Sequence, residues 1–159
     1  MSGKEYCHPY ITSTGTEYII KFKETPNIFP GAENLSVPLI EVIIFTAESI
    51  EVIQTSTTLL ELVAMIRAKA DLLDAVYYSV CSDKMILRSE KRMAMSHQEY
   101  RSHLFKSMFL KANADKKYIN REIIISDPKA GNQYIHLMTG TQNLSAMDII
   151  SEELKKYDK

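Results

Sequence analysis

The order in which hydrophobic spacing changes along the chain constrains its fold most. Apolar and polar residues alternate, as in half-buried strands, over residues 6–12, 16–23 and 39–46. Helical spacing begins near residue 58, and an apolar strand-like stretch follows over 75–81. A second helical pattern starts at 96, strand-like runs return over 118–126 and 133–139, and a last helix is expected over 145–157. The sequence therefore predicts the order β-β-β-α-β-α-β-β-α.

Two of the expected helices begin with capping boxes. Thr58-Leu59-Leu60-Glu61 and Ser96-His97-Gln98-Glu99 each place a hydroxyl three residues before a glutamate. This spacing lets the two side chains bond reciprocally to free backbone N–H groups of the first helical turn. Beyond the second box, apolar residues recur at helical spacing, at Tyr100, Leu104, Phe105, Met108 and Phe109.

Strands separated by helices, with hairpins at both ends, favour an α+β fold. We expect one α+β domain over residues 1–159, with a single mainly antiparallel sheet and the helices packed on one face. Residues 75–81 are apolar on both faces, which indicates a central strand. That strand could run parallel to a neighbour through a right-handed crossover. Residues 82–95 fit neither a helix nor a strand pattern.

Residues at the inward positions of these elements predict a single buried cluster. Its expected members are Ile20, Phe22, Val42, Ile44, Val63, Ile66, Val76, Tyr78, Leu104, Phe105 and Met108. One helix layer would leave other apolar strand residues uncovered, and a second copy of the chain often closes such a face. The sequence thus predicts a homodimer through Ile19, Leu39, Ile43, Phe45, Tyr134 and Met138.

The run from Tyr10 to Phe22, YITSTGTEYIIKF, is similar to the start of a small uncharacterised family of Bacteroides-type bacteria, a domain of unknown function. The resemblance extends to the threonine-capped helix, to the strand containing Val76-Tyr77-Tyr78, and to the Arg-x-x-x-Phe helix from Arg101 to Phe105. That family has no established activity. The resemblance therefore implies a fold class and a bacterial origin, and no site residues.

Composition excludes several classes of protein. With 159 residues, the chain can bury about two-thirds of its surface without disulfides or metal. Its two cysteines, Cys7 and Cys81, lie far apart, which indicates free thiols in a reducing cytoplasm. The first residues have no apolar stretch typical of a secretory signal, and no run approaches the roughly 20 apolar residues of a membrane span. We therefore expect a cytoplasmic protein with no membrane partner.

Charge is unevenly distributed along the chain. Residues 84–121 hold ten Lys and Arg against three acids, a net charge of +7, whereas the whole chain has a net charge of −1. Such asymmetry points to an acidic partner or to nucleic acid, or to two halves that neutralise each other in the fold. The candidate binding surface comprises Lys84, Arg88, Lys91, Arg92, His97 and Arg101.

Sequence motifs for other chemistry are missing. His97 and His103 are six positions apart, so on a helix they diverge by roughly 120° and cannot form the i, i+4 pair that binds a metal. The glycine-rich phosphate loop, the dinucleotide pattern, the nucleophile elbow and the zinc-protease motif are absent. We expect no metal, no cofactor and no catalytic residue, and a packing or hydrogen-bonding role for His136.

These observations favour a bacterial, non-enzymatic protein-interaction module with a protein partner or a second copy. The alternative is a nucleic-acid-binding or small nuclease-like protein that uses the basic segment 84–121. Basic residues on one contiguous face would favour nucleic acid. A concave pocket holding His97, Tyr100 and Arg101 would favour an enzyme.

Overall fold

The computed structural model describes residues 4–11, 13, 15, 17–46, 56–81, 96–129 and 131–157. Its strands and helices follow the chain in the predicted order and give an α+β fold. The strands are β1 (Glu5–Ile11), β2 (Glu17–Glu24), β3 (Leu39–Thr46), β4 (Val76–Val80), β5 (Tyr118–Ile125) and β6 (Gln133–Gly140). The helices are α1 (Ser56–Leu72), α2 (His97–Ala112) and α3 (Leu144–Lys155), with short 3-10 turns η1 (Ala32–Asn34) and η3 (Thr141–Asn143).

The six strands form one sheet, in the order β1-β2-β3-β4-β6-β5. Neighbouring strands are antiparallel except β3 and β4, which run parallel because α1 connects them as a crossover. The sheet is therefore mainly antiparallel, as predicted. β4 lies between β3 and β6, in the internal position that the apolar residues on both its faces indicated.

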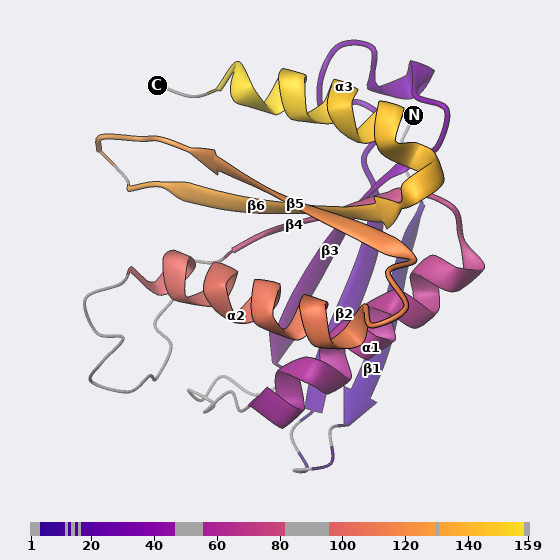
Figure 1. Ribbon diagram of the computed structural model, residues 1–159, viewed down its shortest axis with the longest axis vertical. Helices are drawn as coiled ribbons and strands as arrows, with labels where there is room; N and C mark the ends of the chain where they lie inside the picture. The colour runs from indigo at the N-terminus through magenta and orange to yellow at the C-terminus, as the bar shows by residue number, and fades with distance from the viewer. Residues whose placement is uncertain are drawn as a thin grey trace.

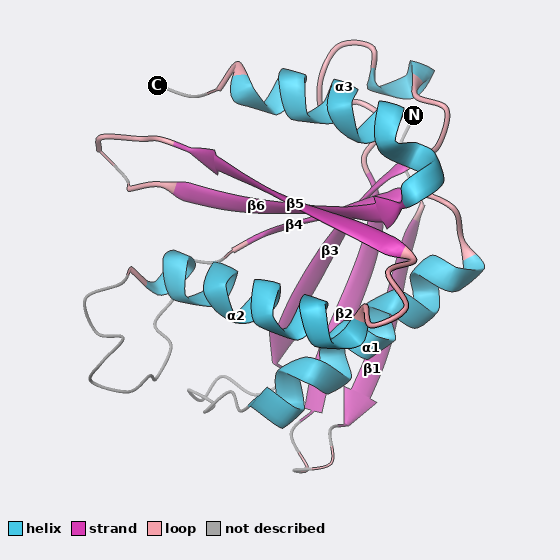
Figure 2. Ribbon diagram, viewed as in Figure 1, coloured by secondary structure: helices cyan, strands magenta, loops and turns pink. Residues whose placement is uncertain are grey.

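The helices occupy both sides of the sheet (Figures 1 and 2). α1 and α2 lie on one side, and α3 lies on the other, against β5 and β6. The position of α3 corrects the expectation that the helices share one face. Ile135 and Leu137 of β6 point away from α1 and α2, so a second cover is needed to bury them. Met147 and Ile150 of α3 supply that cover.

The sheet accordingly separates two hydrophobic cores. The core under α1 and α2 includes Tyr18, Ile20, Phe22, Ile40, Val42, Leu62, Ile66, Tyr77 and Phe109. The core under α3 includes Phe29, Leu39, Val76, Tyr78, Ile123, Leu137, Met147 and Ile150. The prediction of one cluster was wrong for Val76 and Tyr78, because a strand that is apolar on both faces does not reveal which face meets which helix. Phe105 packs at the margin of the first core and is half-buried.

Three of the six residues predicted to form a dimer surface are instead buried within the fold. Leu39 belongs to the core under α3, and Met138 belongs to the core under α1 and α2. Tyr134 is buried, and its hydroxyl donates to Glu99 over 3.0 Å. Ile19 and Ile43 are half-buried, and the side chain of Phe45 lies outside the described part of the structure.

The sheet divides where the pairing between β3 and β4 stops. These strands pair only from Leu39↔Val76 to Glu41↔Tyr78. Beyond that point β3 continues along β2 as far as Thr46, and β4 continues along β6 as far as Val80. Figure 1 shows the two groups, β1-β2-β3 and β4-β6-β5, running in different directions from this seam. The carboxyl ends of the two parallel strands therefore diverge.

Candidate functional site

A layer of polar side chains lies beneath α2. The register places Ser79 of β4, His136 of β6 and Glu122 of β5 in one row across the sheet. His136 faces α2, where Ser102 meets it. Ser102 and His136 are each only 1% exposed. Because buried polar groups are costly unless they are hydrogen-bonded, this layer must be satisfied within the fold.

The hydrogen bonds of the layer form a connected chain. The Ser102 hydroxyl donates to the Glu122 carboxylate, and Ser102 Oγ lies 2.7 Å from His136 Nε2. Lys106 Nζ lies 3.2 Å from Glu122 Oε1 at the solvent side of the layer. On the opposite edge of the imidazole ring, His136 Nδ1 lies 3.3 Å from Asn120 Oδ1. The imidazole is thus held between α2 and β5.

Burial sets the protonation states of these groups. It lowers the pKa of His136 to about 4, so the imidazole is neutral at pH 7. Burial also raises the pKa of Glu122, but the hydrogen bonds from Ser102 and Lys106 outweigh it and leave that pKa below its ordinary value. Burial raises the pKa of Cys81 to about 12, so this thiol keeps its proton.

A serine hydroxyl beside an imidazole is the geometry of a nucleophile and its base. Here the single hydroxyl proton of Ser102 goes to Glu122, so in this arrangement Ser102 does not donate its proton to the imidazole. Both groups are also covered by α2. The arrangement therefore fixes α2 to the sheet and does not activate Ser102.

The first turns of α2 lie next to this layer, beside the end of β4. Cys81 directly follows β4, and its backbone N–H donates to Tyr134 O over 2.9 Å. The positive charge of Arg101 partly offsets the effect of burial on the pKa of Cys81. Gln98 Nε2 donates to Asn132 O over 3.1 Å. Several polar side chains thus meet where β4 ends beside the start of β6.

The candidate binding residues from the sequence divide into two groups. Lys84, Arg88, Lys91 and Arg92 lie outside the described residues. His97 and Arg101 are half-buried and lie one turn apart at the start of α2. The structure thus places these two residues in the first two turns of α2, whose neighbours Gln98 and Glu99 contact Asn132 and Tyr134 at the start of β6.

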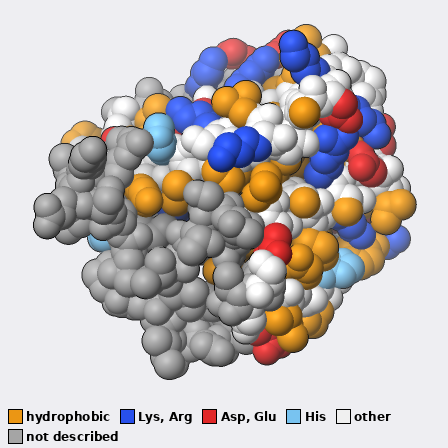
Figure 3. Space-filling model, turned by 60° about the horizontal axis from the view of Figure 1, so that its bottom comes forward, with side chains coloured by type: hydrophobic (Ala, Val, Ile, Leu, Met, Phe, Trp, Pro, Cys, Tyr) orange, Lys and Arg blue, Asp and Glu red, His pale blue; other side chains and the backbone are white. Residues whose placement is uncertain are grey.

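Other basic residues of the segment are paired with acids. Ion pairs join Lys106 to Glu122, Lys117 to Asp71 and Arg121 to Asp148, all three with acids outside the basic segment. Figure 3 shows basic side chains interleaved with acidic and apolar ones on the described part of the face that it draws. The segment is therefore partly neutralised by acids elsewhere in the fold.

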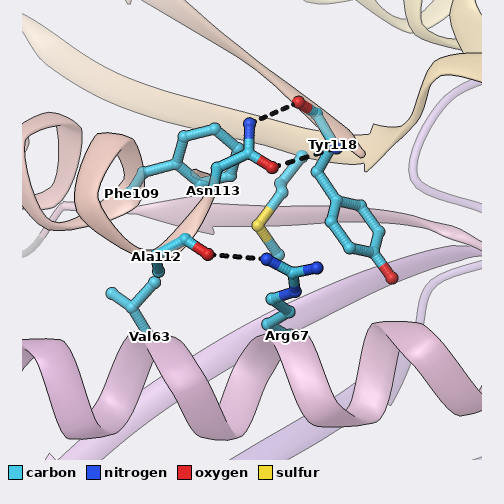
Figure 4. Close-up of a pocket in the computed structure, with 7 residues that line it drawn as sticks. Val63, Arg67, Phe109, Ala112, Asn113 and Tyr118 are labelled. Carbon is cyan, nitrogen blue, oxygen red and sulfur yellow. Dashed lines mark hydrogen bonds between the residues drawn. The ribbon is translucent and has the colours of Figure 1, made fainter. Parts of the chain in front are cut away.

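A small cavity lies at the opposite end of α2, between α1 and β5 (Figure 4). It is lined by Val63, Arg67, Phe109, Ala112, Asn113, Tyr118 and Met138. Arg67 Nη1 donates to Ala112 O over 2.6 Å, and the guanidinium lies 5.4 Å from the centre of the Tyr118 ring. It also forms an ion pair with Asp115. Because Arg67 of α1 contacts Ala112, Asp115 and Tyr118, the cavity lies at a junction between α1 and α2.

Among the described residues, no group of three His, Cys, Asp or Glu side chains is arranged to hold a metal ion. Cys7 and Cys81 are free thiols. No helix within the described ranges has both the length and the apolar character required to cross a membrane. No protein-family model, curated protein or solved structure matches the chain.

Sequence reasoning missed Ser102 and Glu122. A signal for Ser102 was present, because it stands three and seven residues before Phe105 and Phe109 and so shares their face of the helix. A serine in that phase indicates a buried polar partner. The expected hydrogen-bonding role of His136 agrees with its contacts to Ser102 and Asn120.

Proposed function

We propose that this protein binds a small anionic molecule at the end of the sheet where β3 and β4 separate. The observation that carries the proposal is that the pairing of these parallel strands stops at Glu41↔Tyr78 while each strand continues along its other neighbour. In sheets with parallel strands, ligands commonly bind outside the carboxyl ends of such strands. We therefore expect a ligand to bind at this end of the sheet.

The start of α2 supports an anion as the ligand class. α2 follows β4 and begins toward the left of Figure 1, whereas α1, which follows β3, begins near the bottom of that view. Helix N-termini carry a partial positive charge and backbone N–H groups that favour anions. Arg101 adds a full positive charge in the second turn of α2, and His97 stands one turn before it. A phosphate or carboxylate group would find matching charge here.

The test is a titration with pyrophosphate, followed residue by residue through backbone amide chemical shifts. We expect shifts concentrated at residues 79–81 and 97–101, and at least a tenfold loss of affinity in Arg101→Ala. Lys111→Ala is the matched control, because it removes a basic side chain from the exposed far end of the same helix. Shifts gathered around Lys111 and Lys116, or none at millimolar pyrophosphate, would overturn the proposal.

The second candidate is the protein-interaction module that the sequence favours. The face of β1, β2 and β3 that points away from α1 and α2 supports it, because half-buried Ile19 and Ile43 lie there. In the reducing cytoplasm expected from the sequence, Cys7 on this face would stay a thiol. The nucleic-acid alternative has less support, since Lys106, Lys117 and Arg121 are already paired with acids.

A further inference from the structure

The C-terminal segment of α2, residues 107–112, is held in the fold by apolar packing. Met108 and Phe109 are buried there, and Phe109 belongs to the core under α1 and α2. Asn113, which follows the helix, exchanges two hydrogen bonds with the backbone of Tyr118. None of these contacts uses a group that titrates between pH 4 and 7.5, so acid should leave this segment in place.

The N-terminal segment of α2, residues 97–106, is attached to the sheet largely through hydrogen bonds. Glu99 accepts from a tyrosine hydroxyl of β6, Ser102 lies 2.7 Å from the buried imidazole of β6, and Lys106 pairs with a glutamate of β5. Phe105, which also contacts the imidazole, is only half-buried. Because several of these contacts involve ionisable groups, the attachment of this segment depends on pH.

His136 is the buried centre of this attachment. Its side chain is only 1% exposed, and the centre of the Phe105 ring lies 4.6 Å from the centre of the imidazole. Each ring nitrogen already faces a protein group, Ser102 Oγ at one edge and Asn120 Oδ1 at the other. A proton taken up by this ring would place a positive charge where water does not reach, and burial disfavours the charged form.

The carboxylate that faces the imidazole is shared with another cation. Glu122 Oε2 lies 3.7 Å from His136 Nε2, but Glu122 Oε1 is paired with Lys106 Nζ over 3.2 Å. Burial lowers the pKa of His136 more than Glu122 raises it, and the charge of Lys106 lowers it further. The other ionisable groups of α2, β4 and β6 next to this layer are Glu99, Arg101, Cys81 and Tyr134. A charged imidazole is therefore favoured only if the N-terminal segment moves away and lets water reach the ring.

We propose that the N-terminal segment of α2 is a proton-operated latch, which acid releases from β5 and β6 while the C-terminal segment stays in place. Uptake of one proton by His136 drives the release, and loss of that proton lets the segment dock again. The released state is a local opening of the helix, distinct from unfolding of the whole chain. The latch does not rest on the proposed anion site, because no step of the release involves a bound anion.

Backbone hydrogen exchange at pH 7.5 and pH 5 in dilute urea, corrected for the intrinsic exchange rate at each pH, tests the latch. An imidazole with a pKa of about 4 when docked and near 6.5 when released makes release about 30-fold more frequent at pH 5 than at pH 7.5. Amides of residues 101–106 should therefore exchange about 30-fold faster at pH 5. Urea should not change their rate, because a local opening exposes little surface. Amides of residues 109–112 should exchange more slowly, with the urea dependence of global unfolding.

Two histidine variants show which group takes up the proton. His136→Gln should abolish the pH response of residues 101–106. His103→Gln removes a histidine of the same helix outside the polar layer and should keep that response near its wild-type size. A response that persists in His136→Gln would overturn the latch. So would amides of residues 101–106 that share the urea dependence of residues 109–112 at pH 5, because acid would then act only through global unfolding.

A surface variant decides the matter if His136→Gln does not fold. Lys106→Gln removes an exposed cation and leaves Glu122 to pair with the imidazolium alone, so the pH response should fall below about tenfold. Lys111→Gln removes an exposed cation from the C-terminal segment and should leave the response at its wild-type size. Equal responses in the two lysine variants would overturn the latch. Neither lysine variant changes Arg101, so pyrophosphate binding can fail or succeed separately.

Discussion

At the scale of single residues, the buried His136 determines how the fold responds to acid. Its pKa is about 4 in the folded chain and near 6.5 when solvated. Between these values the unfolded chain holds a proton that the folded chain does not. Stability therefore falls as pH is lowered from about 6.5 toward 4, and is fully present above that window.

The whole difference amounts to about 3 kcal/mol of unfolding free energy. We expect His136→Gln, which cannot titrate, to lose this part of the pH dependence. Urea unfolding of both proteins at intervals between pH 7.5 and 4 measures it. Parallel stability curves for the two proteins would show that His136 is not buried in its neutral form.

The sequence predicted the residues of the candidate site unevenly. A hydrogen-bonding role for His136 could be inferred, because Tyr134 and Met138 place it on a mostly apolar strand face. Glu122 could not be inferred, since a single acid in a β-strand normally faces solvent. It is drawn inward only because Ser102 of α2 and His136 of β6 meet there, and pairings between distant segments leave no local signal in a sequence.

At the scale of elements, α2 was the helix most fully determined by its sequence. The serine half of the capping box is formed, with Ser96 Oγ accepting from Glu99 N over 3.2 Å, while the Glu99 carboxylate accepts from the Tyr134 hydroxyl. The apolar spacing predicted the helix correctly, but it did not predict how far each aromatic side chain is buried. Phe109 is buried and Phe105 is half-buried, because the polar layer occupies the space beneath the first half of the helix. A hydrophobic stripe shows which side of a helix faces inward, but not how closely each turn approaches the sheet.

Truncation of the two aromatic residues should reveal this difference. We expect Phe109→Ala to lower the unfolding free energy by about 3–5 kcal/mol, as for a fully buried phenylalanine. Phe105→Ala should cost roughly half as much, since its ring is partly solvated before unfolding. Chemical denaturation of both variants at one pH makes the comparison. An equal or reversed order would mean that the start of α2 packs more tightly than its end.

At the scale of the whole molecule, the strand groups β1-β2-β3 and β4-β6-β5 are joined more extensively by a common hydrophobic core than by backbone hydrogen bonds. β3 and β4 meet over three pairs, whereas the core under α1 and α2 joins Ile20 and Phe22 on one side of the seam to Tyr77 and Met138 on the other. Leu62 and Ile66 of α1 belong to this shared core. The helix layer therefore couples the two parts of the sheet.

Ile66→Ala should weaken that coupling selectively. In the wild type we expect the slowest-exchanging amides of both parts to report one common opening free energy, because they open together. In the variant, amides of β2 and β3 should separate from those of β4 and β6 into two groups, alongside a loss of about 2–4 kcal/mol in overall stability. Native-state hydrogen exchange in dilute denaturant measures both. Two groups already present in the wild type would show that the seam itself divides the fold.

The proline in β1 has a consequence for what happens at high concentration. β1 and β5 are the two outer strands of the sheet, and free outer strands are the usual template for amyloid-like growth. Pro9 removes a backbone donor from the middle of β1, and Arg121 and Glu122 place charges in the middle of β5. Both borders thus carry gatekeeper residues that discourage the addition of further strands. High concentration should therefore not extend this sheet into fibrils by strand addition at either border.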